Sequence, residues 1–325
     1  MKPRYPMPPY PNGWFQVAVS TEVAPGELKT LKYFGKELVL FRGQDGTARV
    51  LDAYCPHLGA HLGLGKVVDD NLECRFHRWQ WAGDGSLMHV PDAKRAPAVK
   101  ADCWPVDEKN GIIFVWHHAE GAAPTWEIPE LGKVGTPAYV DWEVQKYRIK
   151  THCQEIGENV TDVAHFTGLH QMEHPDQDEY KAWAEGHVFC AEQHMKMAKG
   201  AMAGFEVPVS TRTHGPGVAI LTVLVDPIET VSFITQTPVD EESVDAWVNF
   251  TLRKQDDPEA DRMITEIYKN FLNEQYQDDI PIWETKKYIA RPPLSDFDGP
   301  VPLWRKWYRQ FYSQSFDEDA WAKAS

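Results

Sequence analysis

Cys55-Pro56-His57 and Cys74-Arg75-Phe76-His77 are the two stretches that decide how the first part of the chain folds. Their pattern is C-x-H and C-x-x-H, with sixteen residues between the two motifs. Two thiolates and two imidazoles in this arrangement suit a [2Fe–2S] cluster, with Cys55 and Cys74 on one iron and His57 and His77 on the other. Neutral imidazoles raise the reduction potential of such a cluster above that of an all-cysteine cluster.

A zinc site of two cysteines and two histidines is the alternative for the same four ligands. Zinc fingers usually space their histidines as H-x3–5-H, whereas here each cysteine pairs with a histidine in its own loop. The spacing therefore favours the iron–sulfur cluster. We interpret the nearby His61 as an ordinary loop histidine.

Composition and charge exclude several classes of protein. The chain has 325 residues, a length typical of two domains. Its net charge is −15 and it has no basic run, so we expect neither a nucleic-acid-binding face nor a patch for anionic membranes. A transmembrane helix would need about 18 or more consecutive apolar residues, and the sequence has no such run. The N-terminus lacks the apolar core of a signal peptide.

The chain has five cysteines, of which two are assigned to the cluster. The other three, Cys103, Cys153 and Cys190, are an odd number and have no paired spacing. We therefore interpret them as small buried residues with reduced thiols. Reduced thiols indicate a reducing compartment, and we place the protein in the cytoplasm.

The chain divides into a β-rich first part and a mixed second part. Short stretches of strand pattern, interrupted by turn residues, run from Trp14 to about Trp116. A segment rich in Gly, Pro and small residues follows. We predict an α+β protein with an all-β domain at 1–120 that carries the metal loops, a linker at 121–137 and a second domain at 138–325.

A second candidate metal site begins at Glu158. Asn159 and Asp162 share a helical face, and His165 follows Asp162 by one turn. His170 is five residues after His165, about 140° out of phase on an ideal helix. Both histidines can bind one metal only if the helix bends or ends, and Gly168 offers a place for this. Two histidines so close are compatible with the 2-His-1-carboxylate triad of non-haem Fe(II) oxygenases, although H-x4-H alone is a weak signal.

The third ligand is sought on a long helix predicted from Pro258 to about Tyr288. Its apolar stripe continues to an aspartate, Asp279, which is costly to bury unless it is paired or metal-bound. Asp279 is therefore the predicted carboxylate ligand, and Asp278 is the rival, pointing about 100° away. The residues assigned to the stripe are Met263, Ile264, Ile267, Phe271, Leu272, Gln275, Asp279 and Ile282.

Together these motifs resemble the oxygenase components of Rieske non-haem iron oxygenases over nearly the whole chain. The motifs are C-P-H, C-R-F-H, E-N-x-x-D-x-x-H-x-x-x-x-H and the late D-I-P-I-W. Within that family the chain is most similar to 3-ketosteroid 9α-hydroxylase oxygenases and cholesterol 7-desaturases. The stretches W-Q-W-A-G-D-G, D-A-K-R-A-P and R-K-W-Y-R-Q-F-Y carry this similarity. Arg78 is a departure, because most Rieske oxygenases have Gly after the second cluster histidine, but the steroid group varies there.

The resemblance implies a helix-grip catalytic domain and a head-to-tail homotrimer. In that trimer, the cluster of one subunit lies near the mononuclear iron of the next. The carboxylate of Asp162 would bridge His77 of one subunit to His165 of the next, and Asp162 and Asn159 are assigned to catalysis. The chain has no G-x-G-x-x-G motif for NADH. A separate flavin and iron–sulfur reductase would therefore supply electrons, directly or through a ferredoxin.

The resemblance also implies a reaction: hydroxylation of a steroid or similar hydrophobic polycyclic substrate with O2 at Fe(II). Demethylation, arene dioxygenation and desaturation stay open, because the same triad serves all of them. A Rieske electron carrier without oxygenase chemistry is an alternative from another class. Such a carrier needs only the first domain and would leave H-x4-H and Asp279 unexplained.

Overall fold

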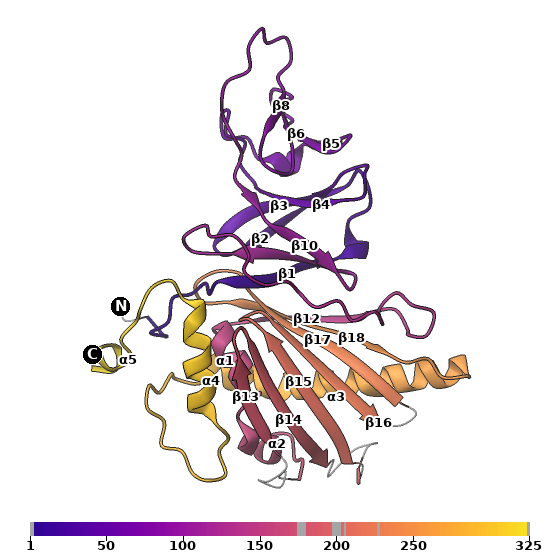
Figure 1. Ribbon diagram of the computed structural model, residues 1–325, viewed down its shortest axis with the longest axis vertical. Helices are drawn as coiled ribbons and strands as arrows, with labels where there is room; N and C mark the ends of the chain where they lie inside the picture. The colour runs from indigo at the N-terminus through magenta and orange to yellow at the C-terminus, as the bar shows by residue number, and fades with distance from the viewer. Residues whose placement is uncertain (1–2, 174–179, 197–202, 205, 226–227, 324–325) are drawn as a thin grey trace. The chain divides into compact units, whose positions relative to one another are not determined.

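The computed structural model describes residues 3–173, 180–196, 203–204, 206–225 and 228–323 (Figure 1). Its contacts divide the chain into two compact units. One unit is Trp14–Glu130, and the other joins Met1–Gly13 to Leu131–Ser325. The first thirteen residues were predicted as part of the first domain, but they group with the second unit because their contacts lie there. Arg4, for example, donates hydrogen bonds to Lys150 and Trp283.

The Trp14–Glu130 unit is built from three antiparallel sheets, with the strand orders β1-β11-β10, β2-β3-β4-β9 and β5-β6-β7-β8. Leu51, Leu62, Leu72 and Trp81 fill the core beneath the predicted cluster loops. The strands are β1 (Gly13–Val19), β2 (Leu28–Tyr33), β3 (Lys36–Arg42), β4 (Ala48–Asp52), β5 (Lys66–Val68), β6 (Asn71–Glu73), β7 (Gln80–Trp81), β8 (Leu87–His89), β9 (Cys103–Trp104), β10 (Val106–Lys109) and β11 (Ile112–His117).

The other unit is organised on a seven-stranded antiparallel sheet of order β12-β18-β17-β16-β15-β14-β13 (Figure 1). Alternate residues of each strand share one face of the sheet. On β15 these are Val207, Val209, Thr211 and Thr213, which line a cavity. The strands are β12 (Glu143–Ile149), β13 (Lys181–Glu185), β14 (Val188–Lys196), β15 (Glu206–His214), β16 (Val218–Val225), β17 (Ile228–Pro238) and β18 (Val244–Leu252).

A long helix, α3 (Pro258–Thr285), packs its inner face against this sheet (Figure 1). Tyr268, Leu272, Tyr276 and Trp283 of α3 share one core with residues of β18 such as Phe250. A sheet packed on a long helix confirms the predicted α+β, helix-grip type of second domain. The other helices are α1 (Cys153–Glu158), α2 (Val163–Gly168), α4 (Val301–Tyr308) and α5 (Glu318–Lys323).

Two details of the predicted helices are wrong. The stripe assigned to α3 is only partly right, because Met263, Ile267 and Ile282 are 61%, 38% and 49% exposed. Aromatic rings, starting with Tyr268, fill the space against β18 in their place. The helical stretch expected around 158–170 is two short helices, α1 and α2, with residues 159–162 between them.

None of the helices in the described part of the chain combines the length and the apolar character needed to cross a membrane.

Candidate active site and metal centres

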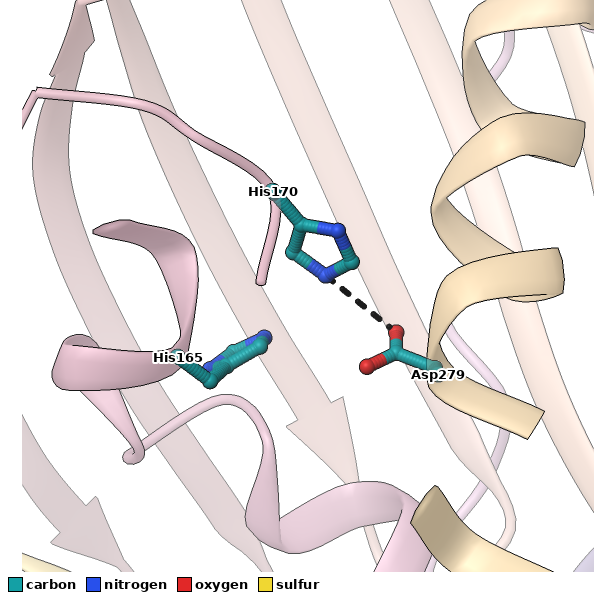
Figure 2. A group of neighbouring side chains, drawn as sticks. All are labelled: His165, His170 and Asp279. Atoms are coloured by element: carbon teal, nitrogen blue, oxygen red, sulfur yellow. Dashed lines mark ion pairs between the residues drawn. The ribbon is translucent and has the colours of Figure 1, made fainter. Parts of the chain in front are cut away.

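Two histidines that are close in sequence meet a distant aspartate inside the second unit. His165 comes from α2, His170 from just after α2, and Asp279 from α3 (Figure 2). One ligand atom from each lies within 4.8 Å of the other two. The rival Asp278 is exposed and is not part of this group. Two imidazoles and one carboxylate are the donor set of a non-haem Fe(II) facial triad.

The end of α2 brings the two histidines together. The helix ends at Gly168, and the backbone N–H groups of Leu169 and His170 both donate to the carbonyl of His165. The two imidazole rings then lie 5.1 Å apart between centroids. A Cβ at Gly168 would meet nothing within 4 Å, so the turn does not depend on a glycine there.

Asp162 is the N-cap of α2. Its carboxylate oxygen Oδ1 accepts a hydrogen bond from the backbone N–H of His165, at 3.3 Å. Its backbone carbonyl, and not its carboxylate, contacts Nδ1 of the His165 ring. The sequence resemblance instead predicts that the carboxylate contacts this ring. A carbonyl at Nδ1 holds the proton on that nitrogen and leaves Nε2 for a metal. Burial lowers the pKa of His165, which favours the neutral ring that a metal requires.

Asp279 is 8% exposed and is oriented by neighbours on both of its oxygens. Its Oδ2 lies 3.4 Å from Nε2 of His170 (Figure 2). Its Oδ1 accepts a hydrogen bond of 3.1 Å from the side-chain amide of Asn159. The indole N–H of Trp283 in turn donates to Asn159, at 3.3 Å. Sequence reasoning missed Trp283, although its place four residues after Asp279 puts it on the same helical face.

The triad opens into a cavity of about 220 Å³ between the sheet and α3. Most of its lining is apolar, as with Leu221 and Ile234 from the sheet and Phe271 from α3. Polar groups that face one another in such surroundings are costly unless a cation or a proton lies between them. The triad residues therefore fit a bound metal ion, and the imidazole and carboxylate donors suit iron.

The predicted cluster ligands also converge. Cys55 and Cys74 are 3% and 2% exposed, and the rings of His57 and His77 lie 4.8 Å apart. Burial, with the Cys74 thiol nearby, raises the pKa of Cys55, so a cationic centre is needed to hold this sulfur as a thiolate. Nδ1 of His61 accepts a hydrogen bond from the backbone N–H of Gly63, at 3.0 Å.

Arg78 has a positive φ of 59°, the left-handed conformation that glycine adopts without strain. Its backbone N–H donates to the carbonyl of Cys74 and closes the second cluster loop. The loop thus requires this conformation whatever the side chain. A required left-handed conformation is a physical reason for glycine at this position in the family that the sequence resembles.

Two family models match the chain. Residues 13–105 match the Rieske [2Fe-2S] domain, and residues 115–312 match the 3-ketosteroid 9alpha-hydroxylase C-terminal domain. A 3-ketosteroid-9-alpha-monooxygenase oxygenase component of Rhodococcus rhodochrous is 32% identical over 93% of this chain and 84% of that protein. The chain belongs to the 3-ketosteroid 9α-hydroxylase family of Rieske oxygenases. A cholesterol 7-desaturase of Caenorhabditis elegans is 30% identical over 95% of this chain and 78% of its own length.

Solved structures share the fold of this Rieske oxygenase. NdmA of Pseudomonas putida CBB5, solved with caffeine, has a TM-score of 0.74 at 20% identity and covers 94% of this chain and 96% of its own. Dicamba monooxygenase, solved with non-heme iron and dicamba, has a TM-score of 0.69 at 20% identity and covers 94% and 98%. The family match confirms a terminal oxygenase with a Rieske [2Fe–2S] domain, which works with a separate reductase. It excludes the zinc site and the simple electron carrier.

Proposed function

We propose that His165, His170 and Asp279 hold a mononuclear Fe(II) and that Cys55, His57, Cys74 and His77 hold the Rieske cluster. The observation that carries this proposal is the meeting of two imidazoles and one carboxylate at an apolar cavity. When bound, the iron supplies O2 activation, with electrons delivered from the cluster. The chain's own residues fix the geometry: Asn159 orients the Asp279 carboxylate, and the Asp162 carbonyl orients the His165 ring.

The proposed substrate is a steroid or similar polycyclic compound, and the proposed reaction is its hydroxylation. Asp279 is the one acidic side chain among the described lining residues, and no lysine or arginine lines the cavity in that part of the chain. An uncharged, mostly apolar ligand therefore suits the cavity. Gln193 and Gln236 add polar groups to the wall, and the side-chain amide oxygen of Gln193 is buried and accepts no hydrogen bond from the described residues. A hydroxyl group on the ligand would supply the missing donor.

The proposed assembly is a homotrimer in which the cluster of one subunit lies beside the iron of the next. Asp162 supports this assembly, because its carbonyl already contacts the His165 ring while its carboxylate lies at the N-terminal start of α2. That carboxylate is the group that we propose accepts a hydrogen bond from His77 of a neighbouring subunit.

A flavin and iron–sulfur reductase, directly or through a ferredoxin, is the proposed electron source. Of the three cysteines predicted to be buried, Cys153 and Cys190 are, whereas Cys103 is exposed, so that part of the prediction is wrong. All three thiols are free of disulfides, which suits the proposed cytoplasmic location.

The test is coupled O2 uptake by the iron-loaded protein with a reductase and a panel of steroids and planar arenes. We expect uptake to rise with steroids, with one hydroxyl group added per O2 consumed. Iron counting must give three irons per chain, two in the cluster and one at the triad. A desaturated or demethylated product would move the assignment to the cholesterol 7-desaturase or demethylase type of reaction. Uptake only with arenes would contradict the steroid proposal.

A further inference from the structure

The first residues of the chain reach the helix that carries Asp279. The guanidinium of Arg4 donates hydrogen bonds to the carbonyls of Lys150, at 2.6 Å, of Trp283, at 2.5 Å, and of Lys286, at 2.9 Å. Lys150 lies shortly before α1, whereas Trp283 and Lys286 lie at the C-terminal end of α3. Carbonyls at the end of a helix have no partner within it. Arg4 therefore supplies donors to the end of α3 and ties it to the start of α1.

Trp283 links this contact to the proposed iron site. Its carbonyl accepts from Arg4, and its indole N–H donates to the side chain of Asn159. The side-chain amide nitrogen Nδ2 of Asn159 then donates to the carboxylate of Asp279. Trp283 is 3% exposed, so its ring has little freedom to move independently of its backbone. The four residues form one continuous series from the N-terminal segment to the carboxylate.

The last turns of α3 need such an external contact. Pro281 lies within the helix, between Asp279 and Trp283. A proline has no backbone N–H, so the carbonyl one turn earlier loses its helical hydrogen bond. The helix is weakened in the segment that sets the relative positions of Asp279 and Trp283. Contacts from outside the helix must then hold that segment.

Other contacts of the N-terminal segment lead to the same place. The hydroxyl of Tyr5 lies 3.1 Å from that of Thr151, and the carbonyl of Pro8 lies 3.0 Å from Nε2 of His152, the N-cap of α1. At the other end, Nζ of Lys286 lies 3.0 Å from the fully buried carboxylate of Glu155 in α1. The segment therefore holds α1, which leads to Asn159, against the end of α3.

We propose that Arg4 is a positioning residue for the iron ligand Asp279 and acts through Trp283 and Asn159. The proposal rests on the proposed function, because it takes Asp279 as an iron ligand. Arginine suits the role, since its planar fork has five N–H donors and reaches three carbonyls at once. Loss of a group that orients a metal ligand typically costs about 10–100-fold in metal affinity. Arg4 acts two residues further away, so a several-fold loss is expected.

The test compares the full-length variants Arg4→Met, Trp283→Phe and their combination. Each single variant should bind Fe(II) at the triad several-fold more weakly than wild type, measured by chelator competition well below the unfolding temperature. Each should also change the EPR spectrum of the ferrous site with nitric oxide as probe, while the cluster absorbance stays unchanged. Because both residues belong to one series, the double variant should add little to either single variant.

Arg309→Met is the matched control, because Arg309 pairs with Glu318 near the C-terminus and has no part in the series. It should leave iron affinity and the nitrosyl spectrum as in wild type. If Arg4→Met lowers only the thermal midpoint and resembles Arg309→Met at the iron, the proposal is wrong. If Arg4→Met fails to fold, Trp283→Phe decides the question. A wild-type nitrosyl spectrum in that variant would show that the proposal is wrong. If wild type binds no iron at the triad, the proposed function falls as well.

Discussion

The four proposed cluster ligands lie within residues 55–77, whereas the three triad residues extend from 165 to 279. The cluster loops are closed by local hydrogen bonds, such as those from Gly59 to Cys55 and from Arg78 to Cys74. The triad is instead assembled by packing the aromatic face of α3 on the sheet. A locally built centre should therefore respond to changes in its own turns. A centre assembled from distant parts of the chain should lose metal affinity when substitutions far from the metal change the orientation of its ligands.

The largest expected effect separates the two centres completely. Asp279→Ala removes the one carboxylate of the triad and should lose about one iron per chain and all turnover, because two histidines alone do not complete the facial triad. The cluster, which shares no residue with the triad, should keep its absorbance and its EPR signal. Iron analysis beside the visible spectrum is the measurement.

Asp278→Ala is the control, since that side chain is exposed and outside the group of ligands. It should retain three irons per chain and wild-type turnover. If Asp278→Ala loses the iron and Asp279→Ala retains it, the helix phase is wrong by one residue.

The second prediction concerns transfer between the two centres. Asp162→Asn keeps the backbone carbonyl that contacts His165 and the shape of the helix cap, but removes the negative charge. In the proposed trimer, the charge is what favours an N–H donor from His77 of the next subunit. The loss should be about 10–100-fold in turnover, with both metals still bound.

A single-turnover experiment isolates this step. Pre-reduced Asp162→Asn protein, mixed with substrate and O2, should leave its Rieske cluster reduced. Reoxidation at the wild-type rate, with product formed, would show that Asp162 serves only as a helix cap.

The third prediction addresses the locally built centre. Gly65 lies between Leu62–Leu64 and β5, and a Cβ there would lie 2.0 Å from the backbone carbonyl of Glu73, the residue before Cys74. Gly65→Ala forces the first loop away from the second and should cost about 1–3 kcal/mol, as overpacking does. The cluster should be lost at a lower temperature than in wild type, as measured by the loss of its visible absorbance. Iron at the triad should be retained. Equal loss of both metals would contradict the separation of the two centres.

The four residues proposed for the cluster could be grouped from sequence alone, and the structure brings their side chains together, because they and the turns that close their loops are adjacent in the chain. For the triad, the sequence indicated the types of ligand and a helix break after His165. The helical stripe used to choose the third ligand was partly inaccurate. Asp279 was predicted by extending an aliphatic stripe whose members Met263, Ile267 and Ile282 are exposed. Trp283 and Arg4 could not be predicted, since their roles depend on where α1 and α3 end in space. Such contacts leave no periodic signal in the sequence.

The smallest expected effect is at Arg78. Its φ of 59° strains any residue except glycine, typically by about 1–2 kcal/mol. Its ion pair with Glu73 is long, at 3.6 Å, and the Arg78 side chain is 69% exposed, so the pair contributes at most about 1 kcal/mol. Relief of backbone strain is partly offset by the extra freedom that glycine gives the unfolded chain. Arg78→Gly should therefore raise the stability of the cluster domain by about 1 kcal/mol or less, seen as a higher midpoint for thermal loss of cluster absorbance.

Arg75→Gly is the control, in the same loop but without a positive φ, and it should lower that midpoint. A lower midpoint for Arg78→Gly would mean that the ion pair with Glu73 outweighs the backbone strain, and that the second cluster loop depends on its side chains as well as on its turn.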